Sequence, residues 1–265
     1  MIKKIFSAFH WRIRFLFSRD LFNYITEYKQ IDFLKAFGPL GSFTLIFNFF
    51  IWKTFLYFSG NRIKNKYFNN NNIRKLHLGC GVHLLDGWLN TDFSPKSSNV
   101  LTLDVTKTFP FLDGVFDYVF NEHLIEHLTY VQGYRMLNEC YRVLRSGGKI
   151  RISTPDLGFL IKIYNNPQIE INKSYINWVT VHEINYAPFC DAVFIINNFM
   201  RSYGHQFIYE EKILRFLMEK CGFEKIEKFN LSQSKDSELC GLENIERLPN
   251  DFLMLETFTL EGTKL

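Results

Sequence analysis

A glycine-bracketed turn after a short apolar run is the feature of this sequence that most restricts its fold. The run RKLHL at 74–78 leads directly into Gly79-Cys80-Gly81, where glycine lets the backbone turn sharply and lets a ligand approach without meeting a Cβ atom. Later apolar runs end at Asp92 and Asp104. Because the carboxyl ends of parallel strands meet at one edge of a sheet, the turn and the two carboxylates predict a ligand crevice there.

Short apolar runs alternate with amphipathic segments after residue 72, as in a sheet covered on both faces. The segment 124–145 has apolar residues at helical spacing and ends in a basic turn followed by glycine, which is typical of a helix terminus. A second helix is predicted at 209–220. The pattern predicts an α/β fold with a Rossmann-like, doubly wound and mostly parallel sheet. The predicted strands are 74–78, 87–92, 100–104, 116–120, 149–153, 223–229 and 252–260.

The four asparagines at 69–72 interrupt any helix, and we place a domain boundary there. Residues 1–72 are predicted as a basic, aromatic, helical N-terminal extension, and residues 73–265 as the α/β domain with a partly helical insertion at about 157–208. Residues 1–66 hold 11 Lys and Arg against 3 Asp and Glu, together with 18 aromatic residues. This composition favours peripheral contact with a membrane surface. Nucleic acid is disfavoured because long apolar runs separate the basic residues.

The segment 37–58 has the length of a membrane-spanning helix. Lys53, Asn48 and the Gly38-Pro39 pair argue against a span, since a lysine at the bilayer centre costs roughly 3 kcal/mol. Three alternatives stay open: a helix in the membrane interface, a helix buried on a partner, and a helix packed on the domain's own core. No secretory signal is convincing, and the five cysteines form no C-x-x-C pair. The chain is therefore predicted to be cytoplasmic, with peripheral contact at the inner membrane face as a further expectation.

The turn lacks the features of a dinucleotide site. His83 or Leu84 stands near the position of a third glycine, and only 13 residues separate Gly79 from Asp92, against about 20 in the NAD pattern. An NAD-dependent enzyme is therefore disfavoured, and a nucleoside without a pyrophosphate is expected. Two carboxylates suit ribose hydroxyls and an exocyclic amine, which donate hydrogen bonds. The alternative is that each aspartate only caps the turn that follows its strand.

Five segments taken together resemble the class I S-adenosylmethionine-dependent methyltransferases, and among them the small bacterial enzymes of methyltransferase type 11. The segments are LHLGCG (76–81), GWLNTD (87–92), LTLDV (101–105), FDYVFNEHLIEHL (116–128) and RVLRSGGKIRISTPDL (142–157). The resemblance covers 73–155 closely and the segment from 204 onward more loosely. It implies a methyltransferase with S-adenosylmethionine as its cofactor.

The resemblance also implies the residues that bind this cofactor. The glycines of the turn would line its methionine part, Asp92 would bind the ribose hydroxyls, and Asp104 would bind the adenine edge. The full implied set is Gly79, Cys80, Gly81, Asp92, Asp104, Val105 and Asn121. Relatives often carry an acidic residue where this chain has His77, and that carboxylate helps to hold the cofactor's amino group. This departure gives some support to a non-catalytic, methyltransferase-like binding module.

Methyl transfer to a hydroxyl requires a group that removes the hydroxyl proton. The predicted catalytic residues are His123, His127 and His205, with His123 and His205 preferred as the base, and each has a structural alternative as a hydrogen-bonded histidine. Glu126, His182 and Arg201 are further candidates. No metal site is predicted, because in NEHLIEH the second glutamate directly precedes the second histidine, unlike the H-E-x-x-H pattern of zinc proteases.

The predicted reaction is O-methylation of a sugar in a cell-surface glycan or in a lipid-linked precursor. Two observations lead to this expectation: the family resemblance and the basic, aromatic N-terminal segment. Methylation of a quinone or another small molecule is the alternative within the same class. The non-catalytic binding module is the alternative from a different class.

Overall fold

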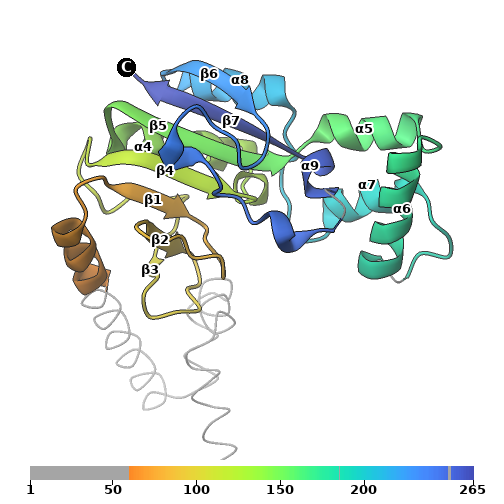
Figure 1. Ribbon diagram of the computed structural model, residues 1–265, viewed down its shortest axis with the longest axis horizontal. Coiled ribbons are helices and arrows are strands. Elements are labelled where there is room, and N and C mark those ends of the chain that lie inside the picture. The colour runs from red at the N-terminus through yellow and green to blue at the C-terminus, as the bar shows by residue number, and fades with distance from the viewer. Residues whose placement is uncertain (1–59, 185, 250–251) are drawn as a thin grey trace, which may run out of the picture. The chain divides into compact units, whose positions relative to one another are not determined.

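The computed structural model describes residues 60–184, 186–249 and 252–265, so most of the predicted extension, including the segment 37–58, lies outside the described residues. Ile63–Leu265 form one compact unit. Its centre is a seven-stranded sheet in the order β3-β2-β1-β4-β5-β7-β6 (Figure 1). The strands are β1 (Lys75–Leu78), β2 (Leu89–Asp92), β3 (Leu101–Thr102), β4 (Phe116–Glu122), β5 (Leu144–Pro155), β6 (Phe223–Phe229) and β7 (Thr257–Lys264).

Strands β1 to β5 pair in parallel, and β7 runs antiparallel between β5 and β6. The prediction of a Rossmann-like, mostly parallel sheet is therefore confirmed. The carboxyl ends of β1, β2 and β4 lie at the same edge, because Leu78 pairs with both Thr91 and Asn121. The glycine turn, Asp92 and the end of β4 thus meet at one crevice edge, as the order of the strands requires.

Two predicted elements differ from the structure. The helix expected over 124–145 is α4 (Tyr130–Val143), preceded by the 3₁₀ turn η1 (Ile125–His127). Thr129 starts α4 there, because its side chain accepts a hydrogen bond from the Gln132 backbone N–H in a capping box. The prediction of a strand over 252–256 is wrong, since these residues form helix α9 (Phe252–Glu256). A short apolar run has no periodicity that separates helix from strand, and packing decided the outcome.

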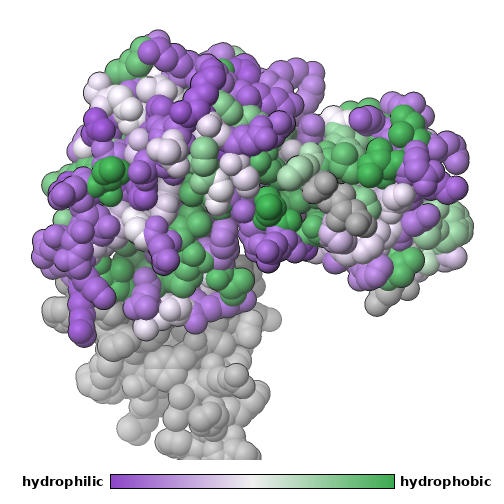
Figure 2. Space-filling view, in the orientation of Figure 1, coloured by the Kyte–Doolittle hydropathy of each residue, from purple (hydrophilic) through white to green (hydrophobic). Residues whose placement is uncertain are grey.

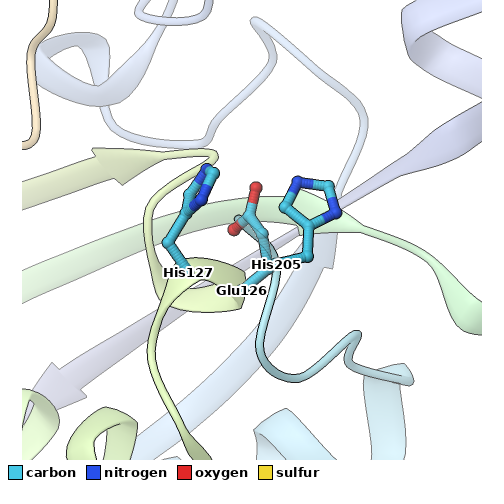
Figure 3. A group of neighbouring side chains, drawn as sticks. All are labelled: Glu126, His127 and His205. Carbon is cyan, nitrogen blue, oxygen red and sulfur yellow. The ribbon is translucent and has the colours of Figure 1, made fainter. Parts of the chain in front are cut away.

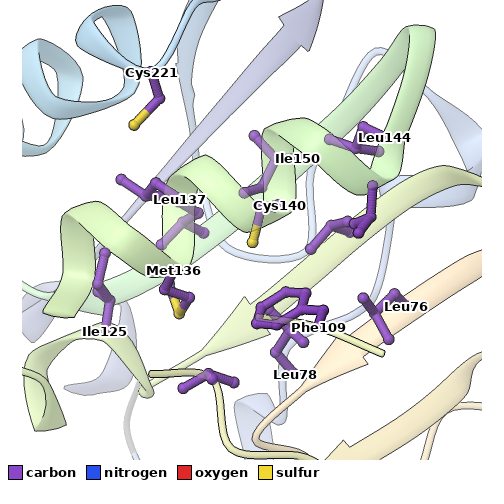
Figure 4. Close-up of a cluster of buried hydrophobic side chains, with 14 of the residues drawn as sticks. Leu76, Leu78, Phe109, Ile125, Met136, Leu137, Cys140, Leu144, Ile150 and Cys221 are labelled. Carbon is purple, nitrogen blue, oxygen red and sulfur yellow. The ribbon is translucent and has the colours of Figure 1, made fainter. Parts of the chain in front are cut away.

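Helices α4 and α8 (Glu211–Lys220) cover one face of the sheet. Leu76 and Leu78 of β1 belong to the same buried apolar core as Met136 and Leu137 of α4, and all four side chains are fully buried (Figure 4). Each fully buried apolar side chain of this kind stabilises the fold by roughly 1.5–3 kcal/mol relative to an exposed one. This core holds the carboxyl ends of β1 and β4 in place beneath the crevice.

A buried ionic network secures the other face of the sheet. Arg151 of β5 is fully buried, and it donates hydrogen bonds to the Glu243 and Glu261 carboxylates and to the Gln233 carbonyl oxygen. A charge without partners is costly in a protein interior, so these contacts depend on one another. The network fixes the segment 230–243 on the sheet, beside the smaller apolar cluster of Trp88 and Phe120.

The insertion at 157–208 forms α5 (Leu157–Asn165), α6 (Glu170–Glu183) and α7 (Ala192–Arg201), which pack with α9 around a second apolar core. In Figure 1 these helices group together beyond the carboxyl end of β5. Half of the exposed large apolar side chains of the described residues belong to this insertion, and several are seen as green patches over its helices in Figure 2. Among the described residues, no helix is long and apolar enough to cross a membrane.

Candidate functional site

The glycine turn and Asp92 form one hydrogen-bonded unit. Gly79 and Gly81 have φ angles of +65° and +54°, which side chains of L-residues rarely adopt. The Gly81 backbone N–H donates to Asp92 Oδ2 at 3.0 Å, and the Cys80 N–H donates to the Thr91 carbonyl oxygen at 3.0 Å. Asp92 therefore lies directly under the turn, at the place where the sequence predicted a carboxylate.

Asp104 and Val105 follow the short strand β3. Asp104 Oδ1 accepts hydrogen bonds from the Thr106 backbone N–H at 3.0 Å and from the Thr106 hydroxyl at 2.6 Å, and Val105 is buried. Asp104 thus caps the turn that follows its strand, as the structural alternative expected. Both bonds use Oδ1, so a role at the adenine edge stays a prediction for this carboxylate.

Several buried polar atoms at the crevice have no hydrogen-bond partner among the described residues. They are both amide atoms of Asn121, Oε1 of Glu122 and Nδ1 of His83. Buried polar atoms are almost always hydrogen-bonded, because leaving one without a partner costs about 1–3 kcal/mol. The donor and acceptor set fits the methionyl end of S-adenosylmethionine, which carries an ammonium and a carboxylate group.

His77 supplies no charge to this crevice. Its side chain is buried, and burial lowers its pKa to about 4, although the hydrogen bond between Nδ1 and Asn90 Oδ1 acts in the opposite direction. The imidazole is therefore neutral at pH 7. A neutral ring in this position braces the Asn90 side chain, which in turn accepts a hydrogen bond from the Leu85 backbone N–H.

A cavity of about 470 Å³ adjoins the end of β4, and His123, His127 and His205 all line it. The structure thus brings together the three histidines that the sequence predicted as catalytic, although 78 positions separate His127 from His205. The insertion and the segments around α9 form the rest of the wall. The other lining residues are Glu126, Pro155, Tyr175, Trp178, Val179, Glu183, Asn198, Phe199, Tyr203, Arg247, Leu248 and Glu256.

Glu126 is the fully buried acid of this cavity. Burial acts to raise its pKa, but the hydrogen bond and charge of His123 outweigh burial and lower the pKa below its usual value. The Thr154 hydroxyl donates to Oε2 at 3.0 Å, and His123 Nδ1 lies 3.2 Å from Oε1. The other ring nitrogen of His123 lies 3.1 Å from the Thr257 hydroxyl oxygen. Nε2 of His123 is thus within hydrogen-bond distance of Thr257, and Nδ1 faces the Glu126 carboxylate, an arrangement that suits an orienting role better than proton removal.

His205 has one ring nitrogen available for chemistry. Its Nδ1 donates to the Phe199 carbonyl oxygen at 2.8 Å, so the lone pair of the neutral ring lies on Nε2. Burial lowers the pKa of His205, which keeps the ring neutral at pH 7. His127 packs edge-to-face on it, with the ring centroids 4.9 Å apart. A neutral imidazole with a free Nε2 can act as a general base.

The Glu126 carboxylate lies between the two imidazoles in Figure 3. One ligand atom from each of Glu126, His127 and His205 lies within 4.8 Å of the other two, so these residues could share a metal ion. The sequence predicted no metal site, and that stays a prediction. The same arrangement serves proton transfer, because a buried anion stabilises an imidazolium beside it.

Sequence reasoning missed most of the cavity wall. Tyr175, Trp178, Val179 and Glu183 share one face of α6, a spacing that was visible in the sequence, but nothing there showed which element this face meets. Of the further candidates, Glu126 lines the cavity, whereas His182 does not. His182 stacks on Trp178 with ring centroids 4.7 Å apart, and its Nδ1 lies 2.8 Å from the Trp178 carbonyl oxygen.

Comparison with known proteins supports the assignment of this chain as a methyltransferase. Residues 76–152 match a family described as a methyltransferase domain, and this range contains the turn, both aspartates and the end of β4. A search of curated proteins found no match. The family match and the order of the strands in this chain's sheet agree. The chain is an S-adenosylmethionine-dependent methyltransferase of class I fold, and S-adenosylmethionine is its cofactor.

Similar solved structures include a SAM-dependent methyltransferase from Archaeoglobus fulgidus, with 18% identity, a TM-score of 0.44 and coverage of 79% of this chain and 94% of the other. One from Thermotoga maritima, described as a possible histamine N-methyltransferase, has 16% identity, a TM-score of 0.43 and coverage of 83% and 96%. Phosphoethanolamine N-methyltransferase 2 from Haemonchus contortus has 16% identity, a TM-score of 0.40 and coverage of 73% and 49%.

Proposed function

We propose that this methyltransferase O-methylates a sugar hydroxyl in a cell-surface glycan or in a lipid-linked precursor of one. The observation that carries the proposal is the neutral His205 ring, with its free Nε2, in the wall of a cavity that also includes His123, the residue directly after β4. A cavity of about 470 Å³ is within the usual size range of small-molecule sites, about 300–1,000 Å³.

The cavity wall has the chemistry of a sugar site. Trp178 and Tyr203 offer aromatic faces for the apolar face of a sugar ring, while Glu183 and Asn198 offer hydrogen-bonding groups for hydroxyls. A quinone, the alternative acceptor, has fewer groups that could satisfy the carboxylates of Glu126, Glu183 and Glu256 in the same wall. The polar half of the wall therefore favours a polyhydroxylated acceptor.

The roles of the protein residues follow from these contacts. When bound, S-adenosylmethionine supplies the electrophilic methyl group. His205 Nε2 accepts the proton of the attacking hydroxyl, and the hydrogen bond from Nδ1 to the Phe199 carbonyl oxygen holds the ring in the required tautomer. The buried Glu126 carboxylate stabilises the imidazolium that results. His123 orients Glu126 from the opposite side.

Two features favour an acceptor carried by a lipid. The insertion that forms the cavity wall exposes a large share of apolar side chains, among them Val181, Tyr186 and Phe189. Residues 1–66 add the basic and aromatic composition of a membrane-surface segment. Peripheral contact at the inner membrane face belongs to the same proposal.

Incubation of the full chain with radiolabelled S-adenosylmethionine and extracted lipid-linked glycans tests the proposal. We expect label in the sugar fraction after the glycan is released from its lipid, and none with the matched variant His205→Gln. Label found only in quinones or in protein would contradict the sugar assignment. No transfer to any fraction, with cofactor binding intact, would favour the non-catalytic module.

A further inference from the structure

The backbone holds Glu126, His127 and His205 together. Glu126 and His127 belong to the turn η1, and the carbonyl oxygen of Glu126 accepts hydrogen bonds from the backbone N–H groups of Gln206 and Phe207, at 2.7 and 3.1 Å. These two bonds fix the loop that carries His205 against η1. The main chain therefore builds this arrangement, and it does not depend on the flexible ends of side chains.

Each of the three side chains offers an atom that can bind a cation. Glu126 is fully buried, and its Oε1 finds no well-aligned hydrogen-bond donor among the described residues, although His123 Nδ1 lies 3.2 Å away. His205 keeps its Nε2 lone pair, because its Nδ1 donates to the Phe199 carbonyl oxygen. The His127 side chain forms no hydrogen bond within the described part of the chain, and its ring packs on that of His205.

Neighbouring groups orient these atoms as they do around protein-bound metal ions. A histidine that binds a metal almost always donates its other ring N–H to a carbonyl or carboxylate oxygen, and a carboxylate ligand is itself hydrogen-bonded. His205 makes such a bond to Phe199, and Glu126 Oε2 accepts the Thr154 hydroxyl at 3.0 Å. Two histidines and one glutamate also form the ligand set of known zinc sites that keep a fourth position open.

The distances require only a small closure around an ion. One ligand atom from each residue lies within 4.8 Å of the other two, and Figure 3 shows the Glu126 carboxylate between the two imidazoles. Zinc–ligand distances of about 2.0–2.2 Å place tetrahedral ligand atoms roughly 3.3–3.5 Å apart. His127 can turn to close the gap, because no hydrogen bond among the described residues holds its ring.

We propose that Glu126, His127 and His205 form a binding site for Zn²⁺, or for a similar divalent ion that prefers imidazole ligands, and that an ion bound there stops methyl transfer. The ion takes the Nε2 lone pair of His205, so this histidine can no longer accept the proton of the acceptor. The blocking step rests on the proposed role of His205 as the base, whereas the binding of the ion does not. The reaction itself needs no metal, so the site is inhibitory.

A search of the sequence for zinc motifs does not find this site. The pair Glu126 and His127 has the wrong order for H-E-x-x-H, and the third ligand, His205, lies 78 positions further along the chain.

Calorimetry of the full chain with Zn²⁺ tests the binding, with Cys190→Ser and Cys240→Ser in every protein because exposed thiols bind zinc by themselves. We expect saturable binding. His127→Gln should weaken it at least 10-fold, since even the loss of a group that only orients a ligand costs about 10- to 100-fold. His182→Gln is the matched control, because this histidine stacks on Trp178 outside the cavity lining, and it should leave the affinity unchanged. Mg²⁺, which prefers oxygen ligands, should not bind at this site.

Equal affinities of the His127→Gln and His182→Gln proteins for Zn²⁺ would overturn the proposal. If His127→Gln fails to fold, X-ray absorption by Zn²⁺ bound to the protein with the intact cluster decides instead. Imidazole nitrogens at about 2.0–2.1 Å from the ion would support the site, whereas a spectrum with oxygen ligands alone would refute it.

Methyl-transfer assays test the blocking step. Zn²⁺ should stop label transfer at the concentrations that fill the site, and EDTA should restore it. In His127→Gln the inhibition should need at least 10-fold more Zn²⁺, with each protein compared with its own uninhibited rate. Inhibition of both proteins at the same Zn²⁺ concentration would contradict the block at this cluster. Calorimetry needs no acceptor, so sugar methylation could fail its own test while the zinc site stands, and the reverse.

Discussion

The crevice at the carboxyl ends of β1, β2 and β4 and the cavity proposed for the acceptor are built in different ways. The crevice comes from one stretch of chain, residues 77–122, in which a backbone turn and the ends of three neighbouring strands supply the groups. The cavity wall comes from η1, α6, α7, the loop at 203–205, and the segments around η3 (Ile245–Arg247) and α9. The crevice is therefore a property of local chain geometry, and the cavity is a property of tertiary packing.

This difference predicts that variants in the two regions separate cofactor binding from chemistry. The largest effect is expected for His205→Gln, which removes the proposed base but should leave the affinity for S-adenosylhomocysteine unchanged. We expect kcat to fall about 10²- to 10⁴-fold, the usual contribution of a general base. Steady-state kinetics beside calorimetry measures both quantities, and a loss of cofactor affinity would show that the two regions are not separable.

The pH profile of the wild type sharpens this prediction. In the proposed mechanism the neutral form of His205 is the active one, and burial lowers the pKa of this histidine below the ordinary 6.5. The rate should therefore not depend on pH near pH 7, and it should fall only below pH 6.5. The acid limb of the profile should be absent in His205→Gln. An acid limb that persists in the variant would assign it to another group, with His127 the nearest candidate.

His77 should make the free energy of unfolding depend on pH in the acid range. The unfolded chain binds a proton at this histidine below pH 6.5, whereas the folded protein does so only below about 4. The neutral buried form therefore stabilises the fold above pH 6.5, and about 3 kcal/mol of unfolding free energy is lost as the pH falls from 6.5 to 4. Urea unfolding across this range measures the loss, and His77→Gln should flatten the dependence.

Asp92→Ala should weaken cofactor binding about 10- to 100-fold. The Asp92 carboxylate accepts a hydrogen bond from the Gly81 backbone N–H, and it is the group proposed to bind the ribose hydroxyls. Asp104→Ala is the matched comparison. Both carboxylates accept a hydrogen bond within their own turn, Asp92 from the Ser94 N–H and Asp104 from Thr106. Only Asp92 also holds the glycine turn, so we expect a smaller loss for Asp104→Ala. Calorimetry with S-adenosylhomocysteine ranks the two variants. Equal losses would mean that a carboxylate that caps its own turn can still bind the nucleoside fully.

Trp178→Ala tests the cavity from its aromatic side. Loss of one stacking face should raise KM for the acceptor about 5- to 10-fold, in line with about 1 kcal/mol for an aromatic contact, and should leave the cofactor affinity unchanged. Acceptor titrations at saturating S-adenosylmethionine measure the change. A fall in kcat at constant KM would instead place Trp178 in the positioning of His205.

The smallest effect is expected from chelators. Since the sequence predicts no metal site, treatment with EDTA should leave the rate unchanged. Glu126, His127 and His205 are close enough to bind one ion, so this experiment decides between proton transfer and metal chemistry for the cluster. An activity that EDTA abolishes and Zn²⁺ or Mn²⁺ restores would overturn the prediction.

Most of the sheet was predictable because short-range patterns encode it. The apolar runs gave the strands, the glycine turn marked the first crossover, and the aspartates marked strand ends. The failure at 252–256 has a physical cause: FLML can pack in either conformation, and the second core formed with α5 and α6 selected the helix. The Glu122 carboxylate was overlooked because its open oxygen becomes apparent only when its surroundings are known.

The sequence alone determined the fold class, because apolar runs and a sharp turn between a strand and the next acidic strand end are local properties of the chain. The cofactor followed from the resemblance of five segments to the class I methyltransferases. Only the tertiary structure decided which histidine keeps a free nitrogen and which acid stays unpaired. Thr257 and Asn244 lie 134 and 122 positions along the chain from the groups that they contact, His123 and Glu122. Phe199 is only six positions from His205, but the hydrogen bond between them forms in a loop that the packing of the insertion holds in place. Burial and hydrogen bonding, which set both, arise from packing between distant segments.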